Sequence, residues 1–171
     1  RIIDHAAGLG ISVMPEVEIP AHAKALLKVI PELRDQEDKS CEESVQGYVE
    51  NTINPAMPAT WKYLEKILPE IINMFPFGVI HLGCDELPPK VWQSSPAIKK
   101  LKKKQGLKST EDVLEWTMQK AAGIVVEAGA RPAAWEEAGR GKNGGIGQGA
   151  LLFSWSGQEP GLKVARAGYD V

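Results

Sequence analysis

Two adjacent carboxylates at the end of a short apolar stretch are the clearest chemical signal in this sequence. Residues 77–84 (Phe-Gly-Val-Ile-His-Leu-Gly-Cys) are typical of a buried strand, and Asp85 and Glu86 follow directly. Pro88 and Pro89 keep the next residues from continuing as a helix. Because unpaired carboxylates are costly to bury, a hydrophobic strand that ends in two of them indicates a functional site. The alternative interpretation is a helix N-cap followed by an acidic first turn.

Other predicted strands also end in side chains that could do chemistry. In chain order these residues are Glu16, Glu18 and His22, then Trp135, then Trp155. Tryptophans beside carboxylates provide apolar walls on which sugar rings can stack. The combination therefore favours a carbohydrate as the bound molecule.

The elements that must position these residues alternate between strand and helix. Strands are predicted at residues 11–18, 77–84, 131–137 and 151–155, with a further strand starting at Tyr169. Helices are predicted at residues 2–9, 22–30, 58–75, 96–104, 110–128 and 160–167. This alternation predicts an α/β fold with a parallel sheet, as in part of a (β/α)8 barrel whose active site lies at the C-terminal strand ends. An open doubly wound sheet is the alternative, but it would require a glycine fingerprint after a strand, and the sequence has none.

The composition excludes several other classes of protein. The chain has 171 residues and a net charge of −2, which gives no electrostatic reason to expect nucleic-acid binding. Its one basic cluster, at 99–104, is typical of the solvated face of a helix. No apolar run is long enough for membrane insertion. The two cysteines form neither a disulfide framework nor a metal quartet, and the acids beside Cys84 raise a thiol pKa, so Cys84 is not expected to be a nucleophile.

The positions of the two carboxylates restrict the mechanism. Consecutive strand residues face opposite ways, so Asp85 and Glu86 are not expected to face each other across a substrate as in ordinary retaining glycosidases. They can instead lie on different sides of one substrate atom. One residue would then donate a proton, and the other would hold the substrate by a hydrogen bond. His22 is either a member of this site or a helix-start histidine bonded to backbone, and His81 is expected to be a packed core histidine. A metal site formed by His22, Glu18 and Asp85 is conceivable, but neither HxH nor HExxH spacing supports it.

Two segments carry a resemblance to a known family. Residues 14–23 (Met-Pro-Glu-Val-Glu-Ile-Pro-Ala-His-Ala) resemble the Pro-Glu-Ile-Asp-Met-Pro-Gly-His segment of glycoside hydrolase family 20, the β-N-acetylhexosaminidases. Residues 81–86 (His-Leu-Gly-Cys-Asp-Glu) resemble that family's His-x-Gly-Gly-Asp-Glu signature. Asn54-Pro55, Trp135-Glu136-Glu137 and Trp155 follow in the family's order, so the resemblance covers essentially the whole chain.

The resemblance implies an enzyme that removes terminal N-acetylhexosamine from oligosaccharides or glycoconjugates. In this family the acetamido oxygen of the substrate is the nucleophile, so no metal and no cofactor are expected. Glu86 would be the general acid and then the base, and Asp85 would hold the acetamido N–H. Trp135 and Trp155 would form the walls of the acetamido pocket, and His22 would belong to a hydrogen-bond relay that tunes Glu86.

Three positions depart from the family pattern. Glu18, expected on the substrate-binding side of the site, stands where the family has aspartate, and its carboxylate sits one methylene further out. Cys84 and Ala21 each replace a glycine, and both are small enough to be tolerated.

The resemblance also implies that residues 1–171 are an internal fragment of a single catalytic barrel domain. The match corresponds to strands three to six and the start of strand seven, and both ends of the chain look cut. The family's sugar-clamping arginine and the active-site residues of strands seven and eight would lie elsewhere, so the fragment alone is expected to be inactive. The alternatives are a carbohydrate-binding remnant without turnover and a metal-dependent barrel hydrolase.

Overall fold

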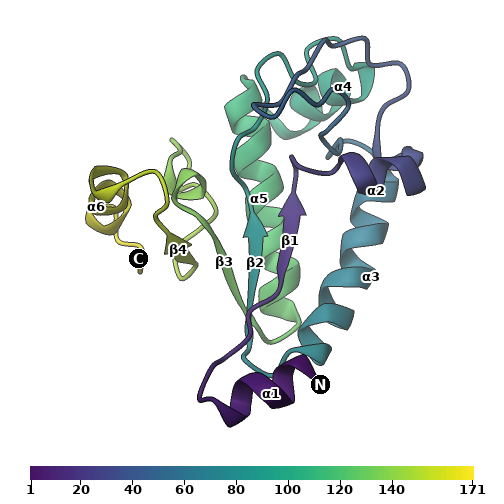
Figure 1. Cartoon of the computed structure of the whole chain (residues 1–171). Helices are drawn as coiled ribbons and strands as arrows, with labels where there is room; N and C mark the ends of the chain where they lie inside the picture. The colour runs from purple at the N-terminus through teal and green to yellow at the C-terminus, as the bar shows by residue number, and fades with distance from the viewer.

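A four-stranded parallel sheet organises the chain. The computed structural model describes all of residues 1–171. Its strands β1 (Glu16–Ile19), β2 (Val79–Gly83), β3 (Arg131–Trp135) and β4 (Leu151–Phe153) lie side by side in the order β1-β2-β3-β4 (Figure 1). Every neighbouring pair is parallel, which confirms the predicted α/β class.

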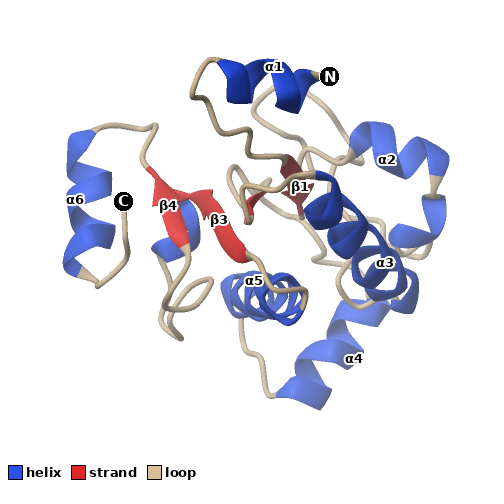
Figure 2. Ribbon diagram, turned by 90° about the horizontal axis from the view of Figure 1, so that it is seen from below, coloured by secondary structure: helices blue, strands red, loops and turns tan.

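Two long helices cover one face of this sheet. They are α3 (Pro58–Met74) and α5 (Thr110–Glu127), which lie together against the strands when the sheet is viewed from below (Figure 2). The remaining helical elements are α1 (Ile2–Gly8), α2 (Lys24–Val29), the 3₁₀ turn Pro31–Leu33, α4 (Pro96–Gln105), the 3₁₀ turn Glu136–Gly139 and α6 (Gln158–Arg166). None of these helices is both long and apolar enough to cross a membrane.

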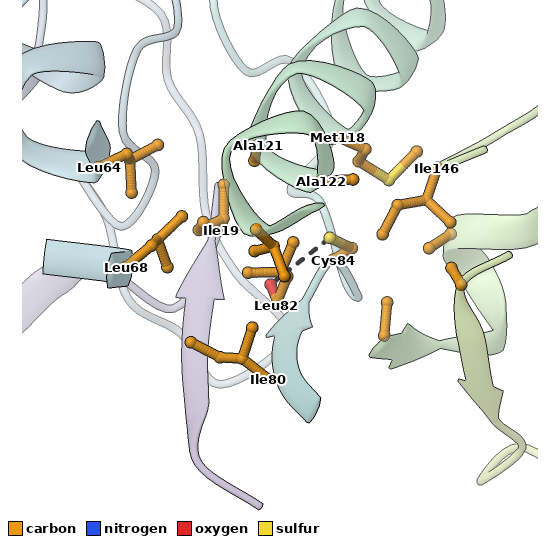
Figure 3. Packing of buried hydrophobic residues seen from close by; sticks show 14 of the residues in the cluster. Ile19, Leu64, Leu68, Ile80, Leu82, Cys84, Met118, Ala121, Ala122 and Ile146 are labelled. Carbon is orange, nitrogen blue, oxygen red and sulfur yellow. Dashed lines mark hydrogen bonds between the residues drawn. The ribbon is translucent and has the colours of Figure 1, made fainter. Parts of the chain in front are cut away.

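The hydrophobic core lies between the sheet and these two helices. Ile19 of β1 and Ile80 and Leu82 of β2 point toward Leu68 of α3 and Met118 of α5 (Figure 3), and all five side chains are buried. Alternate residues of a strand point to opposite faces of the sheet. The residues between these apolar positions therefore point to the second face, which carries the polar and aromatic side chains.

The first strand differs from its prediction. It begins at Glu16 rather than at residue 11, and Ile11 is 56% exposed. The amide of His81 donates to the carbonyl of Pro15 at 2.9 Å, and the pairing register shifts between Glu16 and Ile19. Apolar residues alone predicted the longer strand, but the residues before Pro15 have no strand beside them to pair with.

The end of the chain pairs with β4 at one residue. Asp170 forms an isolated parallel bridge with Leu151 of β4. The amide of Leu152 donates to the carbonyl of Asp170 at 2.9 Å. The chain thus forms a single parallel bridge beside β4, in the place where a strand was predicted from Tyr169 onward.

Local signals set the ends of the helices. Ser109 and Asp112 form a reciprocal capping box at the start of α5, which begins at Thr110, as predicted. Ser95 caps α4 by accepting a hydrogen bond from the Ile98 amide, and Gly106 ends α4 in the left-handed conformation with φ 71°. Helix α3 continues through Pro69 to Met74.

Candidate active site

Three predicted site residues meet at the C-terminal end of the sheet. The His22 Nε2 atom lies 3.5 Å from Asp85 Oδ2 and 3.4 Å from Glu86 Oε2. His22 comes from the segment after β1, and the two acids come from the segment after β2, so neighbouring parallel strands deliver them to one edge. Both carboxylates turn toward the same imidazole, so the expectation that they point opposite ways is wrong: β2 ends at Gly83, and the two acids lie in the segment after the strand.

The backbone of this site adopts an uncommon conformation. His22, Cys84 and Glu86 have positive φ angles of 53°, 71° and 47°, which non-glycine residues rarely adopt. Each such residue costs on the order of 1–3 kcal/mol, and strain of this kind clusters at functional sites. The N-cap interpretation of Asp85 and Glu86 is wrong, because the next helix, α4, begins only at Pro96.

Gly83 is required by the close approach of Glu18. A Cβ atom at Gly83 would lie 2.0 Å from Glu18 Oε2, and the residue has φ +66°. The absent side chain lets the Glu18 carboxyl lie over the end of β2 beside Asp85. Glu18 Oε2 and Asp85 Oδ1 are both buried without a hydrogen-bond donor.

Burial and mutual repulsion perturb these acids. Burial, followed by the charges of Asp85, Glu16 and Glu86, raises the pKa of Glu18 to about 8. Burial also raises the pKa of Asp85, and the neighbouring His22 partly opposes the shift. Glu18 therefore carries a proton near neutral pH. It brings no second negative charge next to Asp85.

His81 packs against Trp135, which lines the site. It is buried, and its ring packs at a 4.7 Å centroid distance from Trp135 and 5.6 Å from Phe153. Its Nδ1 atom lies 2.8 Å from Glu16 Oε1. Burial lowers the pKa of His81. The predicted packing of His81 in the core is confirmed, and Glu16 from the neighbouring strand lies at its Nδ1 atom, but its buried Nε2 atom has no hydrogen-bond partner.

Trp155 is held by two consecutive carboxylates. Glu136 is fully buried, and its Oε2 atom accepts a hydrogen bond from the Trp155 amide at 3.1 Å. Burial would raise the pKa of Glu136, but hydrogen bonds from Ser156 and Trp155 outweigh it and the pKa is lowered. Glu137 accepts a hydrogen bond from the Trp155 indole at 3.1 Å. These bonds fix the position of a ring that is 52% exposed.

An open pocket of about 360 Å³ brings the predicted residues together. It is lined by Glu16, Glu18, His22, Gln46, Asp85, Glu86, Trp135 and Trp155. Pockets of a few hundred Å³ are the usual size for small-molecule ligands. Acids on one side and indoles on the other suit a sugar, whose hydroxyl groups need hydrogen-bond partners and whose ring faces are apolar.

Comparison with known proteins identifies the family. The sequence model of glycosyl hydrolase family 20, catalytic domain, matches residues 1–171. The chain belongs to this family. A beta-hexosaminidase of Vibrio furnissii is 35% identical to it over 172 residues, covering 100% of this chain and 28% of the relative. The chain thus spans under a third of that relative's length.

Solved structures of family 20 share the fold. The exo beta-N-acetylglucosaminidase of Vibrio harveyi, in complex with N-acetylglucosamine, superposes with a TM-score of 0.95 at 34% identity, covering 99% of this chain and 26% of that chain. The chitobiase of Flavobacterium johnsoniae superposes with a TM-score of 0.82 at 28% identity, covering 98% of this chain and 26% of that chain. The parallel sheet and these family 20 neighbours are consistent with part of a TIM barrel.

The sequence did not predict that Gln46 lines this pocket. Its Nε2 atom donates to Glu86 Oε2 at 2.7 Å across forty residues of sequence. It comes from the long polar segment between α2 and α3, which has no periodicity that would point to one residue. The length of that loop was the only available signal.

One arrangement in the chain could hold a metal ion. It consists of His22, Asp85 and Glu86, whose ligand atoms all lie within 4.8 Å of one another. The metal alternative considered from the sequence used Glu18 in place of Glu86. The structure thus groups a different set of ligands, and the raised pKa of Glu18 disfavours the ionised form that metal binding requires.

Proposed function

We propose that the full-length protein is an exo-β-N-acetylhexosaminidase that removes terminal non-reducing N-acetylhexosamine from oligosaccharides or glycoconjugates. The observation that carries this proposal is the meeting of His22, Asp85 and Glu86 beside Trp135 and Trp155 in one pocket. Family membership supports it, as does the naming of similar proteins as beta-hexosaminidases.

Within that enzyme, residues 1–171 form part of a single catalytic barrel domain. They correspond to strands three to six of a (β/α)8 barrel, and Asp170 belongs to the start of strand seven. The order of four parallel strands with a parallel bridge beside β4 supports this assignment. The site then lies at the C-terminal strand ends, where barrel enzymes carry their chemistry.

The first half of the reaction uses the substrate as its own nucleophile. Glu86 donates its proton to the glycosidic oxygen while the acetamido oxygen attacks the anomeric carbon, so the glycosidic bond breaks and an oxazolinium ion forms. Asp85 accepts a hydrogen bond from the acetamido N–H and directs the oxygen toward the anomeric carbon. Trp135 and Trp155 wall the acetamido group, and His22 tunes Glu86 through their contact.

The second half reverses the role of Glu86. Its carboxylate takes a proton from a water molecule as that water attacks the anomeric carbon, and the oxazolinium ring opens to restore the acetamido group. The sugar leaves with retained configuration, because the anomeric centre is inverted twice. Because Glu18 is neutral, Asp85 carries the negative charge that faces the acetamido N–H.

The Glu86→Gln variant of the full-length enzyme tests this assignment. For substrates with poor leaving groups, kcat should fall by about 10²–10⁴, the usual contribution of general acid–base catalysis. For an activated aryl leaving group the loss should be much smaller, because such a group departs with little help from a proton. Equal losses on both substrates would remove Glu86 from the acid role.

A metal-dependent hydrolase is the second candidate, favoured by the grouping of His22, Asp85 and Glu86. Substrate assistance requires no metal, so turnover should survive dialysis against a chelator. Loss of turnover that a divalent cation restores would favour the metal-dependent enzyme instead.

A further inference from the structure

Gln46 lies closer to Glu86, the proposed general acid, than His22 does. Its Nε2 atom lies 2.7 Å from Glu86 Oε2, whereas the His22 Nε2 atom lies 3.4 Å from the same oxygen. Gln46 also lines the pocket that contains Trp135 and Trp155. The amide therefore bonds to the acid at the edge of the substrate-sized pocket.

The backbone around Gln46 is fixed in a short hairpin. Glu43 and Val49 form an antiparallel bridge at its base. The Ser44 amide donates to the Tyr48 carbonyl at 2.9 Å, and the Ser44 hydroxyl accepts from the Tyr48 amide at 3.2 Å. Gln46 lies in the turn between Ser44 and Tyr48, so these hydrogen bonds across the hairpin hold its position.

The hairpin is tied to the segment that carries His22. The Ala23 amide donates to the Asn51 carbonyl at 2.9 Å, and the Lys24 amide donates to Asn51 Oδ1 at 3.0 Å. The backbone amide of Asn51 in turn donates to the buried carboxylate of Glu42 at 3.1 Å. The two groups that contact Glu86 Oε2 thus come from parts of the chain that are bonded to each other.

The chemistry of the bond distinguishes the two oxygens of Glu86. The amide nitrogen of glutamine can only donate, so the oxygen that it contacts must accept. In a protonated carboxyl group one oxygen carries the proton and the other remains an acceptor. The carbonyl oxygen of a protonated carboxyl group is a stronger acceptor than its hydroxyl oxygen, so the bond from Gln46 to Oε2 favours the proton on Oε1.

We propose that Gln46 is a positioning residue that keeps Glu86 Oε2 as a hydrogen-bond acceptor, so that Oε1 is the oxygen that gives and takes the catalytic proton. The inference rests on the proposed function, because it assigns a role relative to Glu86 as general acid. Without Gln46, the proton can sit on either oxygen and the carboxyl can rotate. Proton donation then becomes less frequent, while the binding of the sugar is unchanged.

The test compares Gln46→Met with Gln36→Met in the full-length enzyme. Gln36 lies on the same polar segment and donates to the Pro31 carbonyl at 2.9 Å, away from the pocket, so its replacement is a matched control. Loss of a hydrogen bond to the neutral, protonated acid predicts a fall in kcat of about 2-fold to 10-fold on a poor leaving group. KM should stay within about twofold, and an activated aryl substrate should lose far less.

A double variant separates positioning from general damage to the fold. In a Glu86→Gln background, Gln46→Met should cause no further loss on the poor leaving group, because both substitutions act on one proton transfer. Additive losses would overturn the inference, as would a Gln46→Met effect no larger than that of Gln36→Met. If Glu86→Gln shows its large leaving-group effect in either case, the proposed function survives. If Glu86→Gln has no effect, both fail.

Discussion

Glu18 changes the balance of charge in the site. Its carboxyl reaches over Gly83, where a Cβ atom would lie 2.0 Å from Glu18 Oε2. There it is close to Asp85 and Glu16, and burial together with their charges raises its pKa to about 8. The site therefore holds four acids near two histidines, and one of those acids is neutral at physiological pH.

This protonation predicts how stability depends on pH. The ordinary pKa of Glu18 is 4.5, and in the folded protein it is about 8. Between these values the folded protein binds a proton that the unfolded chain releases, so the free energy of unfolding falls as pH rises. In the full-length enzyme, Glu18→Gln should make this fall shallower, as measured by urea unfolding at pH 5 and pH 8.

The control for this prediction is an exposed acid on the outer surface. Glu65 lies on α3 and is exposed, so Glu65→Gln should leave the dependence on pH as it is in the wild type. If Glu18→Gln and wild type lose stability equally between the two pH values, Glu18 is not protonated in the folded protein.

At the scale of elements, β3 and β4 contribute indoles rather than acids. Trp135 ends β3 and packs against His81 at 4.7 Å and Phe153 at 6.4 Å. Trp155 follows β4, and Glu136 and Glu137 fix its backbone and ring. Both indoles line the pocket, and the Trp155 ring is exposed on the surface.

We expect Trp135→Ala and Trp155→Ala to weaken the preference for N-acetyl sugars over plain glucosides. Losing one wall of a small apolar pocket changes discrimination by about 10-fold to 200-fold in the ratio of kcat/KM values. The matched control is Trp116→Ala on α5, which removes an indole that packs 5.4 Å from Trp61 away from the pocket. An unchanged ratio in both pocket variants would mean that these rings only support the fold.

At the scale of the whole molecule, the sheet has open edges. β1 pairs only with β2, and β4 pairs with β3 and with the single bridge to Asp170. Open edges expose unpaired backbone groups, and a closed barrel removes them. The chain covers 26% of the Vibrio harveyi enzyme.

Residues 1–171 expressed alone should therefore be poorly soluble or molten and inactive on aryl N-acetylglucosaminides. The open edges and the exposed Trp155 ring favour association, and Glu86 would lack the rest of the barrel to position a sugar. Thermal melting and turnover assays would check this. A soluble chain that melts cooperatively, and whose turnover disappears with Glu86→Gln, would show that this part of the barrel suffices.

Local sequence determined the element types and most of the proposed site. The alternation of strands and helices predicted the parallel sheet, and the start of α5 at residue 110 was predicted as well. Asp85 and Glu86 could be placed at a strand end because parallel strands deliver their C-termini to one edge. These features depend on neighbours in sequence or on a rule of topology.

The tertiary structure decided what depends on partners distant in sequence. The start of β1 depended on pairing with His81, and the proton on Glu18 depended on Gly83 and Asp85. The contact between Gln46 and Glu86 depended on a loop whose fold comes from bonds across the chain. Hydrogen bonds and burial of this kind leave no periodicity in the sequence, because each forms only when the chain has folded.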